Sequence, residues 1–240
     1  MSDKHAMKPR LLLVEDDPIS SRFLSTVLQA LPADVDIAGD CAAALASAGG
    51  HALWLIDANL PDGSGSELLA RLRQRSPATP GIAHTADGSA ALHQQLLDAG
   101  FAQVLVKPLT AQALQTAVRD ALTGAAGATS KTAPAAAADA MADWDDEAAL
   151  RALHGNAQHV EQLRGLFLAE LPSVCEKIAD ALRSDDVAGL QAALHRLRAS
   201  CGFVGAARLA AAVQQLQAAP ASPQARTEFQ AAAGALAAAG

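Results

Sequence analysis

Acidic side chains stand at two points of the N-terminal half where a short apolar run ends. An acidic trio, Glu15–Asp17, follows one run, and Asp57 closes another. Carboxylates that are held close together repel one another, so a cluster of them calls for a cation. Because the donors are oxygen atoms without grouped His or Cys, Mg²⁺ is favoured over zinc. These residues predict a magnesium site that includes a carboxylate able to act as a nucleophile.

A hydroxyl group and an ammonium group follow two further apolar runs. Thr85 closes the run that starts at Gly81, and Lys107 follows the run that ends at Val106. With a cation masking the charge of Asp57 and of an incoming phosphate, these two groups are suited to bind the remaining phosphoryl oxygens. Each part alone is a common surface feature, whereas the four parts in this order predict a site that accepts a phosphoryl group.

Short apolar runs alternate with longer amphipathic segments throughout this half, and the alternation positions the four parts. The runs predict strands and the segments predict helices. Five strand–helix units in about 120 residues are typical of an α/β doubly wound, five-stranded parallel sheet with helices on both faces. Groups that follow the carboxyl ends of such strands meet at one edge. Expected strands are 10–15, 34–38, 52–57, 81–85 and 103–106, and expected helices are 18–31, 42–48, 64–75, 89–99 and 110–122.

The second half has a different pattern. Residues 124–142 are small and lack large apolar side chains, which is typical of a linker. After Trp144 there is no strand pattern, and apolar residues recur at helical spacing. This predicts a short helix followed by an all-α bundle of four longer ones. The expected domains are therefore 8–123, the linker 124–142, and a helical bundle over 143–240.

One histidine of the second half, His195, lies on a helix whose apolar stripe can be drawn. The stripe is Leu190, Leu194, Leu197 and Cys201. His195 belongs to another face, so we expect it to point outward. Neutral imidazole is nucleophilic near pH 7, small neighbours admit a bulky partner, and a nearby cation can pair with phosphate. An ordinary surface histidine is the alternative. The neighbours one turn to either side are Gln191, Ala192, Arg198 and Ala199.

The motifs of the first half resemble the response-regulator receiver family, over about residues 8–123. The matching stretches are LLLVEDDP, DANLPDGSG, HTA at 84–86 and VKPL at 106–109. In this family a carboxylate is phosphorylated with the help of Mg²⁺. The roles that the resemblance implies are Asp57 as phosphoacceptor, Asp16, Asp57, Glu15 (through water) and Asn59 (through its backbone carbonyl) as Mg²⁺ ligands, and Thr85 and Lys107 as phosphoryl contacts.

One position departs from the receiver pattern. The family often has an aromatic residue three positions before the lysine, and here that residue is Val104. The resemblance therefore does not imply an aromatic relay from the phosphorylation site to an output face. A receiver that mainly passes its phosphoryl group onward needs such a relay less.

The stretch LHRLRASCGFVGAARL resembles the histidine-phosphotransfer (HPt) family, in which a histidine is followed by Leu, Lys, Gly and Ser. Arg198 replaces the lysine and keeps its charge, while Ala199 replaces the glycine and adds a methyl group. The resemblance implies that His195 carries a phosphoryl group and that Arg198 contacts it. The matches are His195, Leu197, Ser200 and Gly205, and the expected surroundings of the histidine are Gln191, Ala192, Ala199 and Ser200.

Charge, cysteine content and apolar runs limit the classes of protein to which this chain can belong. The formal net charge is −7, and acidic residues outnumber Lys and Arg in both halves, so we expect no nucleic-acid partner. The three cysteines form no CxxC motif, which fits a reducing compartment. We find no signal peptide and no apolar run long enough to span a bilayer. The sequence predicts a cytoplasmic protein without membrane insertion.

Together these features predict a two-component phosphorelay protein rather than an enzyme. Its partners would be a sensor or hybrid histidine kinase and other receiver domains, since no Walker A motif for ATP is present. One alternative is a single-site response regulator whose helical half is a protein-binding output, in which His195 is inert. A second is a Mg²⁺-dependent phosphatase with Asp57 as its nucleophile.

Overall fold

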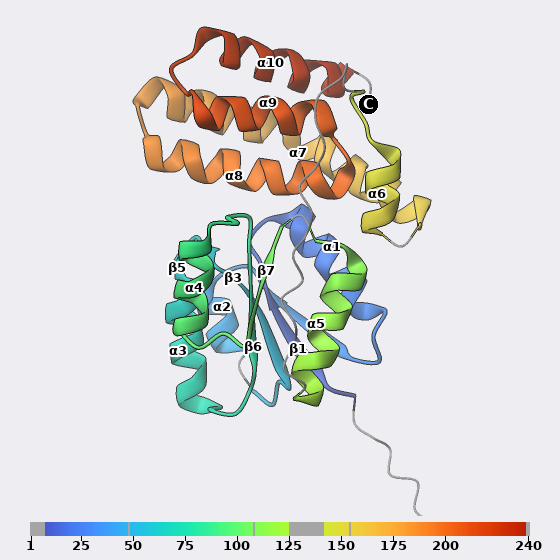
Figure 1. Ribbon diagram of the computed structural model, residues 1–240, viewed down its shortest axis with the longest axis vertical. Coiled ribbons are helices and arrows are strands. Elements are labelled where there is room, and N and C mark those ends of the chain that lie inside the picture. The colour runs from blue at the N-terminus through green and yellow to red at the C-terminus, as the bar shows by residue number, and fades with distance from the viewer. Residues whose placement is uncertain (1–7, 48, 108, 125–141, 154, 239–240) are drawn as a thin grey trace, which may run out of the picture. The chain divides into compact units, whose positions relative to one another are not determined.

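The computed structural model describes residues 8–238 apart from residues 48, 108, 125–141 and 154. The chain divides into two compact units, a sheet with its helices and a group of C-terminal helices (Figure 1). Each unit is described by itself. The linker expected at 124–142 lies, except for its two end residues, outside the described residues.

The N-terminal unit alternates strands with helices along the chain. Its main strands are β1 (Arg10–Val14), β2 (Asp34–Ala38), β3 (Leu53–Asp57), β6 (Gly81–Thr85) and β7 (Gln103–Val106). Its helices are α1 (Pro18–Gln29), α2 (Cys41–Ala46), α3 (Gly65–Arg75), α4 (Ala90–Asp98) and α5 (Ala111–Thr123).

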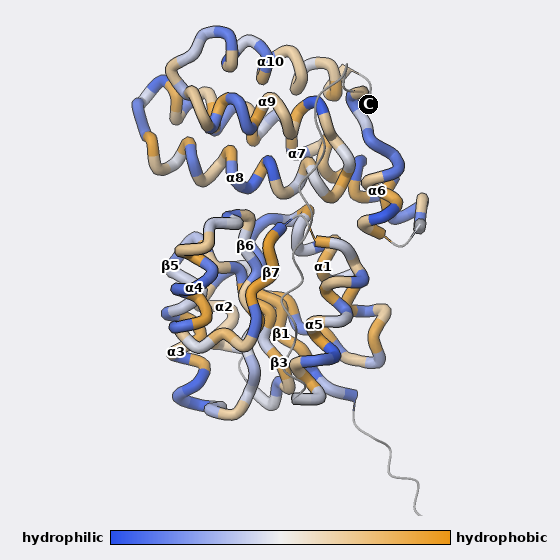
Figure 2. Tube along the Cα trace, in the orientation of Figure 1, coloured by the Kyte–Doolittle hydropathy of each residue, from blue (hydrophilic) through white to orange (hydrophobic). Residues whose placement is uncertain are grey.

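All pairings in the main sheet are parallel, and the strand order is β2–β1–β3–β6–β7. Figure 1 shows α1 and α5 against one face of the sheet and α2, α3 and α4 against the other. The central strands carry hydrophobic residues along much of their length (Figure 2), as a parallel sheet covered on both faces requires. The doubly wound parallel sheet that the sequence predicts is therefore confirmed.

A small hairpin follows β3, which the sequence analysis did not predict. It joins β4 (Asn59–Leu60) to β5 (Gly63–Ser64) through a tight turn. Asp62 in that turn accepts the backbone N–H groups of Cys41 at 2.8 Å and Ala42 at 3.0 Å, which ties the hairpin to the start of α2. The hydrogen bond from Cys41 holds the pKa of Asp62 below its usual value.

Helix starts in this unit are set by short polar side chains. Asp17 accepts the N–H of Ser20 at 2.7 Å and caps α1, whose first residue is Pro18. Ser64 and Glu67 form a reciprocal capping box at the start of α3. These caps explain why α1 and α3 begin within one residue of the starts expected from the sequence.

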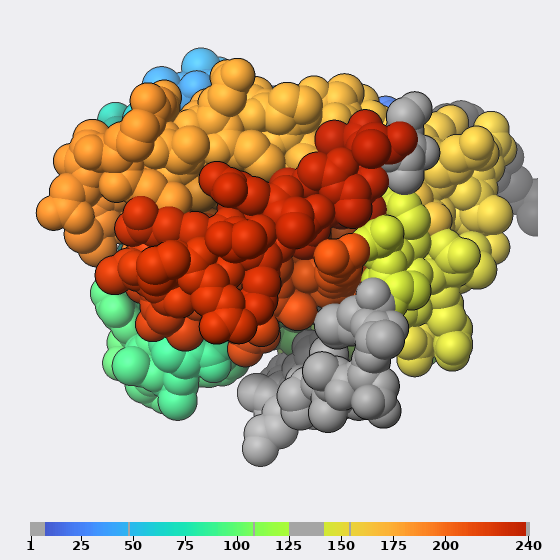
Figure 3. All heavy atoms as spheres, turned by 90° about the horizontal axis from the view of Figure 1, so that it is seen from above, coloured from blue at the N-terminus to red at the C-terminus, as the bar shows by residue number. Residues whose placement is uncertain are grey.

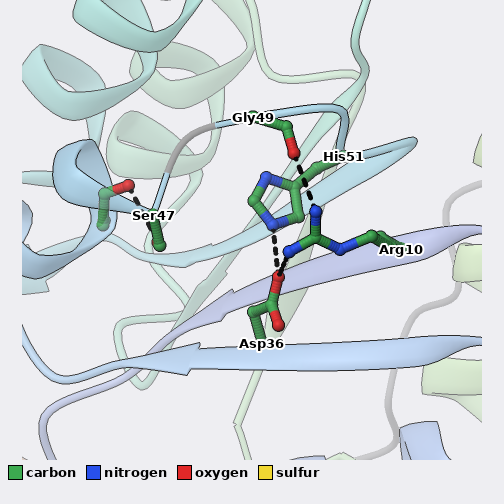
Figure 4. Close-up of polar contacts among 6 residues, drawn as sticks. Arg10, Asp36, Ser47, Gly49 and His51 are labelled. Carbon is green, nitrogen blue, oxygen red and sulfur yellow. Dashed lines mark hydrogen bonds and ion pairs between the residues drawn. The ribbon is translucent and has the colours of Figure 1, made fainter.

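A polar cluster fastens the edge strand β2 to its neighbours (Figure 4). One oxygen of Asp36 lies 2.5 Å from the Arg10 guanidinium and 2.7 Å from Nε2 of His51. Arg10 also donates to the carbonyl oxygen of Gly49 at 3.2 Å. The hydrogen bond from His51, with support from Arg10, lowers the pKa of Asp36.

The C-terminal unit is helical throughout its described residues, and the expected short helix precedes four longer ones. Consecutive long helices pack against each other, and the last returns to the first, so the four close into a bundle. Figure 3 shows α10 crossing one face of this bundle. The helices are α6 (Asp146–Ala152), α7 (Ala157–Ser184), α8 (Val187–Val204), α9 (Ala207–Ala218) and α10 (Pro223–Ala238).

The short helix α6 is fastened to the C-terminal end of α8. The N–H of Asp145 donates to the carbonyl oxygen of Gly205 at 2.6 Å. Gly205 ends α8 with φ +74°, and a Cβ at that position would lie 2.3 Å from the Asp145 carbonyl oxygen. The Arg164 guanidinium of α7 stacks 4.5 Å above the Trp144 ring and pairs with Asp146 at 2.7 Å.

Among the described residues, no helix has the length and apolar composition needed to cross a membrane.

Candidate functional site

Three adjacent strands deliver polar residues to the carboxyl edge of the sheet. Asp57, the last residue of β3, is the direct partner of His84 in β6. Val14 and Ile56 are partners in β1 and β3, so the residues that follow them, Glu15 and Asp57, stand side by side. Neighbouring residues of parallel strands in register project to the same side. The sheet therefore places a carboxylate, a second carboxylate and an imidazole in one row.

The three side chains of this row are buried and lie close together. Glu15 is 3% exposed, Asp57 7% and His84 0%. Nδ1 of His84 lies 3.4 Å from a Glu15 carboxylate oxygen and 3.7 Å from an Asp57 carboxylate oxygen. One ligand atom from each residue falls within 4.8 Å of the others. We call these three residues the strand-end cluster.

The sequence analysis missed the place of His84 in this cluster. It assigned the neighbouring Thr85 to the site and gave His84 no role. The signal that points to His84 is its register, because it pairs directly with Asp57. That signal depends on how β3 and β6 align, which a strand pattern along one segment does not reveal.

The backbone around Asp57 holds its carboxylate in one orientation. One carboxylate oxygen accepts the N–H of Asn59 at 2.9 Å. The N–H of Ala58 donates to the carbonyl oxygen of His84 at 2.9 Å and continues the strand pairing. A Cβ on Gly65 would lie 2.3 Å from the Asp57 carbonyl oxygen. Only glycine allows α3 to begin so close behind the phosphoacceptor candidate.

The three acids after β1 have different surroundings. Glu15 belongs to the strand-end cluster and also accepts the N–H of Asp17 at 3.2 Å. Asp17 is occupied as the N-cap of α1. Asp16 lies between them and is half-buried. Its role as a direct ion ligand stays a prediction.

Thr85 and Lys107 follow the next two strand ends. Thr85 is 1% exposed, and its hydroxyl accepts the N–H of Asp87 at 3.1 Å. Val106 of β7 is the partner of Thr85, and Lys107, which is 6% exposed, comes next in the chain. Val104 is buried in the hydrophobic core of this unit. The four predicted parts of the site therefore follow neighbouring strands at one edge of the sheet.

The chemistry of this edge fits a divalent cation. Glu15 and Asp57 are both buried acids, and a bound cation would offset the repulsion between two carboxylates held this close. The oxygen donors are those that Mg²⁺ takes. The strand-end cluster adds one imidazole nitrogen to that donor set.

The second candidate site lies on one face of α8. His195 and Arg198 are half-buried, while Gln191 and Ala192 are exposed. The apolar stripe expected on this helix is confirmed, since Leu190, Leu194, Leu197 and Cys201 are each at most 4% exposed.

The expectation that Ala199 is an exposed neighbour of His195 is wrong. Ala199 is 3% exposed and Ser200 is 2% exposed. The hydroxyl of Ser200 donates to the carbonyl oxygen of Arg196 at 3.2 Å within the helix. The expectation assumed one buried stripe along α8, whereas α6 packs against α8 in addition to α7 and α9. Ala192 is the exposed small residue of this face.

Two family models match the chain. The first describes the response regulator receiver domain and matches residues 11–119. The second describes the Hpt domain and matches residues 162–239. Both candidate phosphoacceptors, Asp57 and His195, fall inside the matched ranges.

Relatives among characterised proteins match across both domains. The signal transduction histidine-protein kinase BarA of Escherichia coli K12 is 26% identical over 219 residues, which is 87% of this chain and 24% of BarA. The sensor histidine kinase AruS of Pseudomonas aeruginosa is 31% identical over 213 residues, which is 86% of this chain and 20% of AruS. The chain thus spans about a quarter or less of these relatives.

Among solved structures, the signal receiver domain of a putative Luxo repressor protein from Vibrio parahaemolyticus is similar to the first unit. It is 30% identical, covers 50% of this chain and 93% of its own, and has a TM-score of 0.47.

Proposed function

Because the chain joins a response regulator receiver domain to an Hpt domain and so belongs to the two-component signalling proteins, we propose that it is a phosphorelay intermediate. It accepts a phosphoryl group on Asp57 and carries one on His195. The observation that carries the proposal is the buried Asp57, held by the Asn59 N–H at 2.9 Å beside a second buried carboxylate.

At the receiver, the reaction is in-line transfer of a phosphoryl group to a carboxylate. An oxygen of Asp57 attacks the phosphorus of a phosphohistidine, and the P–N bond breaks as the O–P bond forms. The electron pair of the broken bond stays on the imidazole nitrogen of the donor. When bound, Mg²⁺ supplies positive charge that offsets the repulsion between Asp57 and the phosphoryl oxygens.

The chain's own residues prepare this step. The Asn59 N–H orients the Asp57 carboxylate before the donor arrives. Glu15, Asp16, Asp57 and the backbone carbonyl of Asn59 would hold the ion. The Thr85 hydroxyl and the Lys107 ammonium, which follow the next two strands, would bind the phosphoryl oxygens.

At His195 the reaction is the same exchange with a nitrogen nucleophile. The half-buried imidazole attacks an acyl phosphate of a receiver, and the carboxylate leaves as the P–N bond forms. Arg198 lies almost one turn further along α8 and would pair with the phosphate oxygens. The exposed Gln191 and Ala192 leave room for a receiver to dock beside the histidine.

The expected donors and acceptors are other proteins. Neither matched domain is a kinase domain that binds ATP, and the proposed source of the phosphoryl group is a phosphorylated kinase. BarA and AruS are named as histidine kinases, and we propose a sensor or hybrid histidine kinase as donor and a further receiver domain as acceptor.

The proposal is tested by the chemical stability of the label on variants of the full chain. After incubation with a phosphorylated hybrid kinase, wild type should carry both base-labile acyl phosphate and acid-labile phosphohistidine. Asp57→Asn should lose the base-labile fraction, and His195→Gln should lose the acid-labile fraction. His93→Gln, on α4, serves as the control and should keep both. Base-labile phosphate on Asp57→Asn would refute the assignment of the phosphoacceptor.

A further inference from the structure

The imidazole of His84 lies beside the two buried carboxylates, in a position suitable for a metal ligand. His84 is fully buried and is the direct partner of Asp57 across β3 and β6. Glu15 follows β1 on the other side of Asp57. Asp57 and His84 belong to paired strands, and Glu15 comes directly after the neighbouring strand β1, so the pairing of the sheet sets most of their mutual arrangement.

The distances within the strand-end cluster are close to those between ligands of one ion. Ligand atoms that bind a single ion at about 2.1 Å, in a tetrahedral or octahedral arrangement, lie about 3.0–3.5 Å from their neighbours. Nδ1 of His84 lies 3.4 Å from the Glu15 oxygen and 3.7 Å from the Asp57 oxygen. The two distances from His84 therefore need to shorten by at most a few tenths of an ångström to match those around one ion, and the Glu15 and Asp57 oxygens lie within 4.8 Å of each other.

The donor set decides which ion is preferred. Mg²⁺ takes oxygen ligands, whereas Mn²⁺, Co²⁺ and Ni²⁺ also accept imidazole nitrogen, with affinity rising along that series. We propose that His84 is a direct ligand of the receiver's divalent ion and that the site prefers such transition ions to Mg²⁺. This inference rests on the proposed function, because the ion would be the one that assists phosphorylation of Asp57.

A rival explanation uses the same geometry. In this explanation, a protonated His84 is a built-in cation that neutralises Glu15 and Asp57 in place of the ion. The two explanations predict opposite changes in ion affinity when His84 is removed. A ligand contributes to transition-ion affinity and its removal weakens binding, whereas a built-in cation repels the ion and its removal strengthens binding of every divalent ion, Mg²⁺ included.

Calorimetric titration of the full chain with Co²⁺ and with Mg²⁺ separates these explanations. We expect Co²⁺ to bind wild type at least about tenfold more tightly than Mg²⁺. His84→Val should weaken Co²⁺ binding about tenfold or more and change Mg²⁺ binding less than about threefold. His93→Val controls for binding to surface histidines and should match wild type. Tighter binding of both ions to His84→Val would overturn the inference.

Pulsed electron paramagnetic resonance of bound Mn²⁺ reads the ligand directly and does not depend on whether the His84→Val chain folds. Wild type should show a nitrogen coupling that changes when the histidines are labelled with ¹⁵N. His93→Val should retain that coupling, and a folded His84→Val should lose it. Bound Mn²⁺ without a histidine nitrogen coupling in wild type would contradict the inference.

The outcome is distinguishable from failure of the proposed function. If Mn²⁺ binds through oxygen alone and Asp57 still accepts a phosphoryl group, the inference about His84 is wrong and the phosphorelay proposal stands. If Asp57 accepts no phosphoryl group with any divalent ion while Mn²⁺ shows the nitrogen coupling, the metal ligand is established and the phosphorelay proposal is wrong.

Discussion

The two phosphoacceptor candidates are placed by different kinds of structure. Asp57 closes a fully buried strand, and its neighbours come from segments dozens of residues apart that only the sheet brings together. His195 lies half-buried on a single helix, and its neighbours come from the adjacent turns of α8. The receiver site is therefore rigid and depends on the sheet, whereas the surroundings of His195 depend on the turns of a single helix.

The largest effect that this comparison predicts is at Gly65. In Gly65→Ala the new Cβ would meet the Asp57 carbonyl oxygen at 2.3 Å and the Ala58 Cα at 3.2 Å, and both are backbone atoms that cannot easily move. We expect a loss of about 2–3 kcal/mol in unfolding free energy of the first unit, together with slower phosphorylation of Asp57. Chemical denaturation and phosphorylation rates measure the two effects.

Gly165 in α7 provides the matched control. A Cβ at Gly165 meets nothing within 4 Å, so Gly165→Ala should stabilise the helix by about 0.5–1 kcal/mol. If Gly65→Ala is as harmless as Gly165→Ala, the rigid backbone assigned to the receiver site does not exist.

The next effect concerns the two small residues beside His195. Because Ala199 is 3% exposed, Ala199→Leu should overpack its surroundings and lower the unfolding free energy by about 1–2 kcal/mol. Ala192 is exposed, so Ala192→Leu should change stability by less than about 0.5 kcal/mol. Melting temperatures of both variants test the difference.

For phosphoryl transfer, we expect the direct effect to come from Ala192→Leu rather than from Ala199→Leu. The branched side chain of Ala192→Leu lies one turn before His195 on the exposed face and should slow transfer in a folded protein, since the nucleophile needs about 3–3.5 Å to phosphorus. Transfer at the wild-type rate in Ala192→Leu would show that receivers do not dock over this face.

The smallest effect is expected in the polar cluster of Figure 4, which contains no candidate phosphoacceptor. The hydrogen bond from His51 lowers the pKa of Asp36 from its ordinary value of 3.8. A carboxylate with a lowered pKa stabilises the fold above its unfolded-state pKa, and that contribution is lost as the pH falls through the folded-state value. Asp36→Asn should therefore cost about 0.5–1 kcal/mol near neutral pH, because the pair is partly exposed.

Denaturation of Asp36→Asn across pH checks this prediction. The difference from wild type should shrink as the pH falls below 3.8, where Asp36 of the wild type takes up a proton. If the difference in unfolding free energy between Asp36→Asn and wild type were the same at every pH, the loss would come from packing rather than from charge.

Much of the fold follows from local sequence patterns. The strands at 34–38, 81–85 and 103–106 have the boundaries expected from their apolar runs. Side chains at helix starts, among them Asp17 and Ser64, account for the positions at which α1 and α3 begin. Each of these signals lies within a few residues of the feature that it sets.

The features that the sequence did not predict depend on contacts between distant segments. His84 was missed because its approach to Asp57 depends on the register of β3 against β6. Ala199 was expected on the exposed face but is buried, on a helix that packs against α6 as well as α7 and α9. The hairpin at residues 59–64 was missed because strands of two residues carry no periodicity.

The central claim is that a phosphoryl group passes through His195 as well as Asp57. The most direct measurement uses the full chain, a phosphorylated hybrid kinase and a separate receiver domain as final acceptor, and follows label on all three over time. We expect wild type to pass label to the acceptor, whereas His195→Gln should take label on Asp57 and pass none on. Transfer to the acceptor at the wild-type rate through His195→Gln would contradict the relay and leave the helical unit as a protein-binding output.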